Sequence, residues 1–182
     1  DGWYYRMTRA EDLVDLFVAV TRLREAFGSL EQAYLSTAGT HVERASAWVS
    51  LLRSHRHHDE LSRGFKYLVA DPGLGGVPKR LHLFVRWMIR PDDAIDLGLW
   101  TDVGPEVLVM PLDTHTARIC RYLGLTQRKT NDLRAALEIT ESLKLLDGAD
   151  PLRFDFAICH LGISKGCIHR RSVEHCPSCP ID

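Results

Sequence analysis

The sequence has 182 residues, 45% of them hydrophobic, and its 23 Lys and Arg against 24 Asp and Glu give a formal net charge of −1. This length and composition suffice for one or two compact domains with a buried core. No apolar run approaches the ~20 residues of a membrane span, no secretory signal is visible, and the charge neither demands nor excludes a nucleic-acid partner.

The first third of the chain shows the three- and four-residue hydrophobic spacing of amphipathic helices. A helix is predicted over residues 10–27, with Gly28 ending it and Ser29 capping a short second helix. Another helix is predicted within residues 40–55. The polar stretch that follows, residues 55–60, is predicted to be a loop or a helix end.

A glycine-rich turn at residues 73–76 leads to Pro78, which suits a helix start because its missing N–H has no partner there. The helix is predicted from Lys79 to about Arg90, and Pro91 ends it. An irregular connection follows.

The last third of the sequence predicts three further helices. The first begins after Asp113 and Gly124 breaks it, the second has Thr130 or Asn131 as its cap, and the third begins at Asp150-Pro151. No β alternation or internal repeat appears. We therefore expect an all-α bundle, residues 1–160, followed by a cysteine-rich loop, residues 161–182.

Lys79 occupies a position where local electrostatics would favour an acid. The positive end of the helix dipole disfavours a cation in the first turn, which lowers the pKa of the lysine and makes its neutral amine more available. The same helix end and the glycine amides could bind a phosphate. The alternative is a solvated lysine whose side chain turns away from the helix end.

Asp113 follows an apolar run and precedes a predicted helix. Amide hydrogen bonds at a helix start favour the ionised carboxylate, which could stabilise a developing cation. The alternative is a helix cap without catalytic function.

Five cysteines and no signal peptide indicate a reducing compartment, in which clustered cysteines more often bind metals. Cys176 and Cys179 form a C-x-x-C pair and Cys167 precedes them, a spacing suited to a [4Fe–4S] cluster or to zinc. Cys159 does not lie at a matching position for a fourth ligand. The alternative is that these thiols bind no metal.

The segments "GGVPKRLHLF" and "PLDTHTARI" resemble the hairpin and the aspartate motif of the helix-hairpin-helix DNA glycosylases. The closest likeness is to a bacterial family related to the archaeal 8-oxoguanine DNA glycosylases. The cysteine-bearing tail resembles the iron–sulfur loop of endonuclease III. Members of this superfamily normally carry further helical sequence before the position that corresponds to residue 1, so we expect the natural protein to be longer.

The resemblance implies a fold and an activity. It implies a base-excision repair glycosylase for an oxidised purine such as 8-oxoguanine, with AP-lyase activity, Lys79 as nucleophile and Asp113 as catalytic carboxylate facing it. The resemblance also implies a cytoplasmic, nucleoid-associated monomer whose partner is damaged double-stranded DNA. Five residues are implied to contact the DNA: the hairpin glycines Gly75 and Gly76, the neighbouring Arg80, and Arg86 and His115.

Several of these residues have competing interpretations. Arg86 could contact phosphate, pair with a buried carboxylate, or lie on a charged helix edge. His115 is either an orienting group or a histidine on the helix surface. The aromatic side chains Phe84, Trp87 and Trp100 are expected to belong to the core rather than to stack a flipped base. The alternatives for the whole protein are a catalytically silent DNA-binding module and an interaction protein that a metal stabilises.

Overall fold

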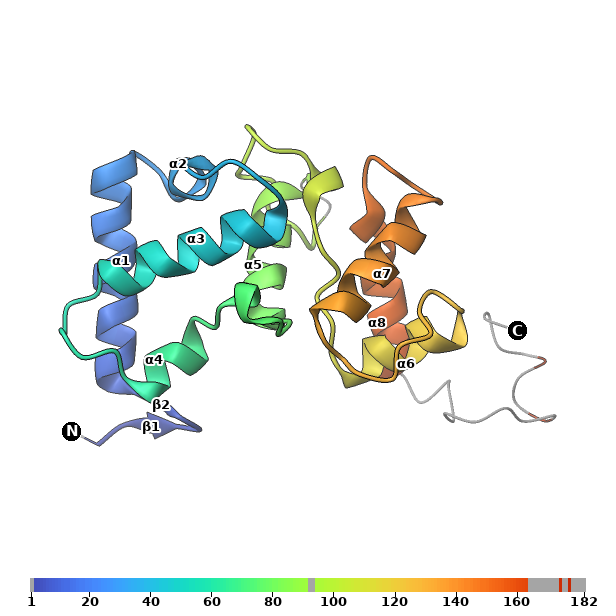
Figure 1. Ribbon diagram of the computed structural model, residues 1–182, viewed down its shortest axis with the longest axis horizontal. Helices are drawn as coiled ribbons and strands as arrows, with labels where there is room; N and C mark the ends of the chain where they lie inside the picture. The colour runs from blue at the N-terminus through green and yellow to red at the C-terminus, as the bar shows by residue number, and fades with distance from the viewer. Residues whose placement is uncertain (1, 92–93, 164–173, 175–176, 178–182) are drawn as a thin grey trace. The chain divides into compact units, whose positions relative to one another are not determined.

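The structure is a computed structural model that describes residues 2–91, 94–163, 174 and 177, and helices dominate these residues (Figure 1). The predicted all-α class is confirmed. Residues 1–81 and 82–182 form two compact units, and the boundary between them falls within helix α5 (Lys79–Ile89). Each unit has a core of its own.

The first unit begins with a hairpin in which β1 (Tyr4–Tyr5) pairs antiparallel with β2 (Thr8–Arg9), as Figure 1 shows. Its helices are α1 (Ala10–Phe27), α2 (Leu30–Leu35), α3 (His41–Ser54), α4 (Arg63–Leu68) and the single turn η1 (Pro72–Leu74). The predicted end at Gly28 and the predicted cap at Ser29 are confirmed, because the Ser29 hydroxyl accepts a hydrogen bond of 3.0 Å from the Gln32 amide. The hairpin and α4 were not predicted, because each is too short for a hydrophobic period.

Helices α1, α2 and α3 pack on one another around a small apolar core. Leu23, Tyr34, Val49 and Phe65 are fully buried there. The hydroxyl of Tyr34 lies 2.8 Å from Nδ1 of His41, so the buried phenol has a polar partner. This core holds α4 and the turn after it in place.

The second unit continues from α5 through η2 (Pro105–Val107), α6 (Thr114–Tyr122), α7 (Leu133–Lys144), η3 (Pro151–Phe154) and α8 (Asp155–Ile163). Its core contains the fully buried side chains of Met110, Ile119, Ile139 and Leu152. Helix α6 packs along α8. Residues 108–112, which precede Asp113, are buried and position the start of α6.

The predicted cap of α7 is wrong by one or two residues. The cap is Asp132, whose Oδ1 accepts a hydrogen bond of 2.9 Å from the Ala135 amide. Thr130 instead donates its hydroxyl to Asp132 over 2.7 Å, and Asn131 accepts from Arg121. Thr130 therefore supports the cap, and Asn131 binds Arg121 of α6 instead.

No helix within the described parts of the chain has the length and apolar character needed to cross a membrane.

Candidate functional site

The predicted glycine-rich hairpin is a short turn between α4 and α5. Asp71 caps η1 by accepting a hydrogen bond of 2.8 Å from the Gly73 amide. Gly75 follows with φ +84°, a left-handed conformation that favours glycine. Its amide donates a hydrogen bond of 3.1 Å to the Pro72 carbonyl. The turn geometry thus requires glycine at position 75.

Arg53 of α3 anchors this turn to the body of the first unit. Its Nη2 donates a hydrogen bond of 3.0 Å to the Val69 carbonyl, and its Nη1 lies 3.9 Å from Oδ2 of Asp71. Since both contacts hold the segment that enters the turn, the turn has a fixed base on α3.

The apex of the turn is open. Gly75 and Gly76 are exposed, with no heavy atom within 4 Å of the position that a Cβ would take. Within the described parts of the chain, the amides of Gly76 and Val77 donate no hydrogen bond to other protein groups. These amides and the N-terminus of α5 are chemically suited to an anion.

Lys79 is the first residue of α5 and is half-buried, which confirms the predicted helix start. The next residue, Arg80, is exposed and turns back onto α4, where its Nη2 donates 2.8 Å to the Tyr67 carbonyl. The turn therefore has two cationic side chains at its exit.

Asp113 is the N-cap of α6. Its Oδ1 accepts a hydrogen bond of 2.8 Å from the Thr116 amide, and the carboxylate is half-buried. The apolar run that precedes it is fixed by a 3.0 Å hydrogen bond from the Met110 amide to Oγ1 of Thr140 in α7. Both the cap and the chain leading to it are therefore well defined.

His115 lies on the exposed surface of α6, with its Nδ1 3.1 Å from Nη2 of Arg118. Of the two interpretations of His115, the structure therefore agrees with a histidine on the helix surface. Lys79 belongs to the first unit and Asp113 to the second. That their amine and carboxylate face one another stays a prediction.

Arg86 takes part in a buried ion network within the second unit. Its Nη1 lies 2.6 Å from Oδ2 of Asp155 and its Nη2 lies 3.0 Å from Oδ2 of Asp96, and its side chain is 4% exposed. Of its three interpretations, pairing with a buried carboxylate is the one that the structure shows. Arg90 joins the network through Asp96 and through Asp150, which its Nη2 approaches to 2.9 Å.

The charge environment of Arg90 follows from this network. Burial lowers the pKa of its guanidinium, but the hydrogen bonds and charges of Asp150 and Asp96 outweigh burial, so the pKa is raised. The three carboxylates come from positions 96, 150 and 155, on both sides of α6 and α7 in the sequence. The network thus ties the end of α5 to the start of α8.

The aromatic residues near α5 differ in exposure. Trp100 is buried and contacts Phe84 edge to face, with 6.0 Å between ring centres, which is the predicted core role. Trp87 is 40% exposed. The core prediction is therefore wrong for Trp87, because its position on α5 points outward.

The predicted metal ligands Cys167, Cys176 and Cys179 lie outside the described residues. Among the residues that the structure does describe, no group of three or more His, Cys, Asp or Glu side chains could hold a metal ion. Cys120 is buried, and burial, together with the nearby Asp155 charge, raises the pKa of its thiol to about 12. Cys120 is therefore a protonated core residue, not a nucleophile.

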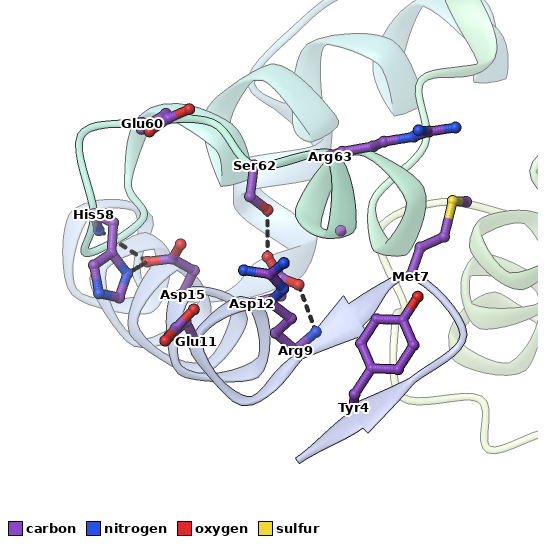
Figure 2. Close-up of a pocket in the computed structure, with 11 residues that line it drawn as sticks. Tyr4, Met7, Arg9, Glu11, Asp12, Asp15, His58, Glu60, Ser62 and Arg63 are labelled. Carbon is purple, nitrogen blue, oxygen red and sulfur yellow. Dashed lines mark hydrogen bonds and ion pairs between the residues drawn. The ribbon is translucent and has the colours of Figure 1, made fainter. Parts of the chain in front are cut away.

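The first unit also contains a cavity of about 580 Å³ that the sequence did not predict (Figure 2). Two buried carboxylates of α1 line it. Oδ1 of Asp12 accepts from the Ser62 hydroxyl, and Oδ1 of Asp15 accepts hydrogen bonds of 2.9 Å from the amides of His57 and His58. Its other lining residues are Tyr4, Met7, Arg9, Glu11, Glu60, Arg63 and Gly64.

The two aspartates hold the loop between α3 and α4. Burial raises the pKa of Asp15, but the hydrogen bonds from His58 and His57 outweigh it, so the pKa lies below its ordinary value. A carboxylate held by loop amides in this way fixes the loop against α1. We therefore assign both aspartates a structural role.

A family model described as "Protein of unknown function (DUF2400)" matches residues 1–164. No curated protein and no solved structure matches the chain. The matched range includes both Lys79 and Asp113 and ends before Cys167.

Proposed function

We propose that this chain, which belongs to the DUF2400 family, is a helix-hairpin-helix DNA glycosylase that removes an oxidised purine such as 8-oxoguanine. The observation that supports this most is the segment from α4 to α5, in which an exposed glycine turn precedes a helix that starts with Lys79. In this proposal the protein acts as a monomer on damaged double-stranded DNA at the nucleoid.

The glycine turn would bind DNA independently of its base sequence. The amides of Gly76 and Val77, next to the positive end of an 11-residue helix, suit a backbone phosphate of the duplex. The damaged base would then leave the stack and enter a pocket, as enzymes that act on bases require.

Lys79 and Asp113 would carry the chemistry. The neutral amine of Lys79 attacks C1′ of the sugar, the bond between C1′ and the base nitrogen breaks, and the base leaves with a proton. The nitrogen lone pair then opens the sugar ring: the C1′–O4′ bond breaks, O4′ takes up a proton, and C1′ becomes the carbon of a Schiff base. Loss of a proton from C2′ then eliminates the 3′ phosphate and cuts the strand. Asp113, fixed by the Thr116 amide, stabilises the positive charge that develops on the sugar or helps to deprotonate the amine.

A panel of duplexes tests this function directly. The full-length protein is incubated with DNA carrying 8-oxoguanine, an abasic site, uracil or no lesion, and the products are separated under denaturing conditions. We expect cleavage at 8-oxoguanine and at the abasic site, with the undamaged duplex left intact. Binding of duplex without any cleavage would favour the catalytically silent DNA-binding module instead.

Gly76→Glu tests the hairpin separately from the chemistry. An added Cβ meets open space at this position, so the fold is retained, but the new carboxylate repels the phosphate. We expect duplex affinity to fall about tenfold or more by fluorescence anisotropy at low salt.

Gly148→Glu is the matched control, because it adds the same charge in the second unit, where an added Cβ would lie 3.5 Å from the Lys144 carbonyl. It should bind duplex as the unchanged protein does. Equal affinities for the two variants would remove the hairpin from the DNA interface.

The cysteine loop is proposed to bind a metal through Cys167, Cys176 and Cys179. Anaerobically purified full-length protein should contain either iron and sulfide, with broad visible absorption, or one zinc ion without such absorption. Cys176→Ser together with Cys179→Ser should abolish the bound metal. Metal analysis that finds neither iron nor zinc in the unchanged protein would leave these cysteines as free thiols.

A further inference from the structure

Four side chains of the first unit alternate between tyrosine and arginine from the β hairpin to the start of α5. The guanidinium carbon of Arg6 lies 5.5 Å from the centre of the Tyr5 ring, and its Nη1 lies 3.4 Å from the Tyr67 hydroxyl. The guanidinium carbon of Arg80 lies 4.6 Å from the centre of the Tyr67 ring. We call Tyr5, Arg6, Tyr67 and Arg80 the Tyr–Arg cluster.

The cluster is accessible to a partner. Tyr5 is 60% exposed, both arginines are exposed, and Tyr67 is half-buried. Tyr4, the neighbour of Tyr5 in β1, lines the cavity instead, since successive strand residues point to opposite faces. The cluster is thus a surface distinct from the cavity.

The cluster also carries positive charge that no carboxylate of the described residues neutralises. The described ion pairs include Arg86, Arg90 and Arg153 but neither Arg6 nor Arg80. The hydrogen bond from Arg6 lowers the pKa of the Tyr67 phenol below its ordinary value, in keeping with the excess of positive charge. Arg63, which also lines the cavity, adds a further exposed cation four residues before Tyr67 on α4.

The backbone at Arg6 has a conformation that is uncommon for a residue with a long side chain. Arg6 is in the two-residue turn of the hairpin with φ +57°, a conformation that favours glycine or asparagine. A long cationic residue at such a turn position indicates a use for its side chain rather than for its backbone.

We propose that the Tyr–Arg cluster binds an unpaired stretch of DNA next to the duplex that the glycine turn binds. Tyrosine rings and guanidinium planes both stack nucleobases, and the two guanidinium charges attract the phosphates between the bases. The inference rests on the proposed function for the identity of the partner as DNA, but it needs neither Lys79 nor Asp113. The proposed DNA contact then extends from the glycine turn along α4 to the β hairpin.

The test measures binding of the full chain to a fluorescently labelled single strand, and to a second strand with 2-aminopurine, whose emission falls on stacking. Arg6→Gly removes the side chain at a position that suits glycine, so thermal unfolding should not shift to lower temperature. We expect single-strand affinity to fall about tenfold in Arg6→Gly and in Tyr67→Ala. The loss of 2-aminopurine emission on binding should also shrink.

Arg153→Ala is the control, because Arg153 lies over Phe154 with 5.8 Å to the ring centre and its loss changes the net charge equally. It should bind the single strand as the unchanged protein does. Unaltered single-strand binding by Arg6→Gly, or no binding by the unchanged protein at low salt, would overturn the inference and leave the cluster to a protein partner. Binding that depends on Arg6 while the lesion panel shows no cleavage would support the cluster and reject the glycosylase.

Discussion

Replacing Lys79 by glutamine is expected to abolish covalent trapping of the protein on 8-oxoguanine duplex by borohydride. Trapping requires a primary amine that adds to C1′ and forms a Schiff base, which borohydride reduces to a stable secondary amine. The amide nitrogen of glutamine is not nucleophilic, so the loss should be complete. Trapped complexes are measured as a shifted band on a denaturing protein gel.

Lys66→Gln is the control for this variant. Lys66 is an exposed lysine of α4 in the same unit, so its replacement removes an equal charge without touching the hairpin. It should trap as the unchanged protein does. Normal trapping by Lys79→Gln would show that another amine is the nucleophile.

Asp113→Asn separates the second catalytic residue from its role as a cap. Asparagine caps helices about as well as aspartate, so α6 should keep its start while the charge is lost. If the carboxylate stabilises a developing cation, base release should slow about a hundredfold or more, with duplex affinity retained. Base release at an unchanged rate would reduce Asp113 to a helix cap.

The second large effect concerns stability. Arg86→Met is expected to lower the free energy of unfolding by about 3–5 kcal/mol, because Asp155 loses this buried cation in a low-dielectric interior while Asp96 retains Arg90. The Asp96 side chain is 0% exposed and that of Asp155 is 5% exposed. Urea unfolding followed by circular dichroism measures the loss.

The size of the loss distinguishes a buried ion network from an exposed ion pair. Lys144→Met, which breaks the exposed pair with Glu141, should cost less than about 1 kcal/mol. Equal losses in the two variants would contradict a stabilising network.

The long helices could be predicted from sequence because their hydrophobic spacing and caps are local signals. Gly28 and Ser29 fixed one boundary, and Asp113 was recognised as a helix start. Helix α4 was missed because six residues are too few to show a period, although Ser62 caps it by accepting a 2.8 Å hydrogen bond from the Phe65 amide.

The partners of charged side chains could not be predicted, since they are distant in sequence. Arg86 meets Asp155, 69 positions away, and Asp15 meets the amides of His57 and His58, more than forty positions away. From sequence alone, Asp12 and Asp15 look like exposed acids near the start of a helix, yet both are 2% exposed. Local rules describe the helix on which a charge sits, while burial depends on what the rest of the fold places over it.

Gly64 at the start of α4 allows the β hairpin to approach α4 closely, next to the Tyr–Arg cluster. A Cβ there would lie 2.0 Å from Oδ2 of Asp12 and 2.4 Å from the Met7 carbonyl, so no side chain fits without moving the β hairpin or α1 away. Tyr67 is three residues further along the same short helix, and Arg6 is the residue before Met7. Even an alanine methyl group at position 64 would therefore displace the backbone next to Arg6 from the helix that carries Tyr67.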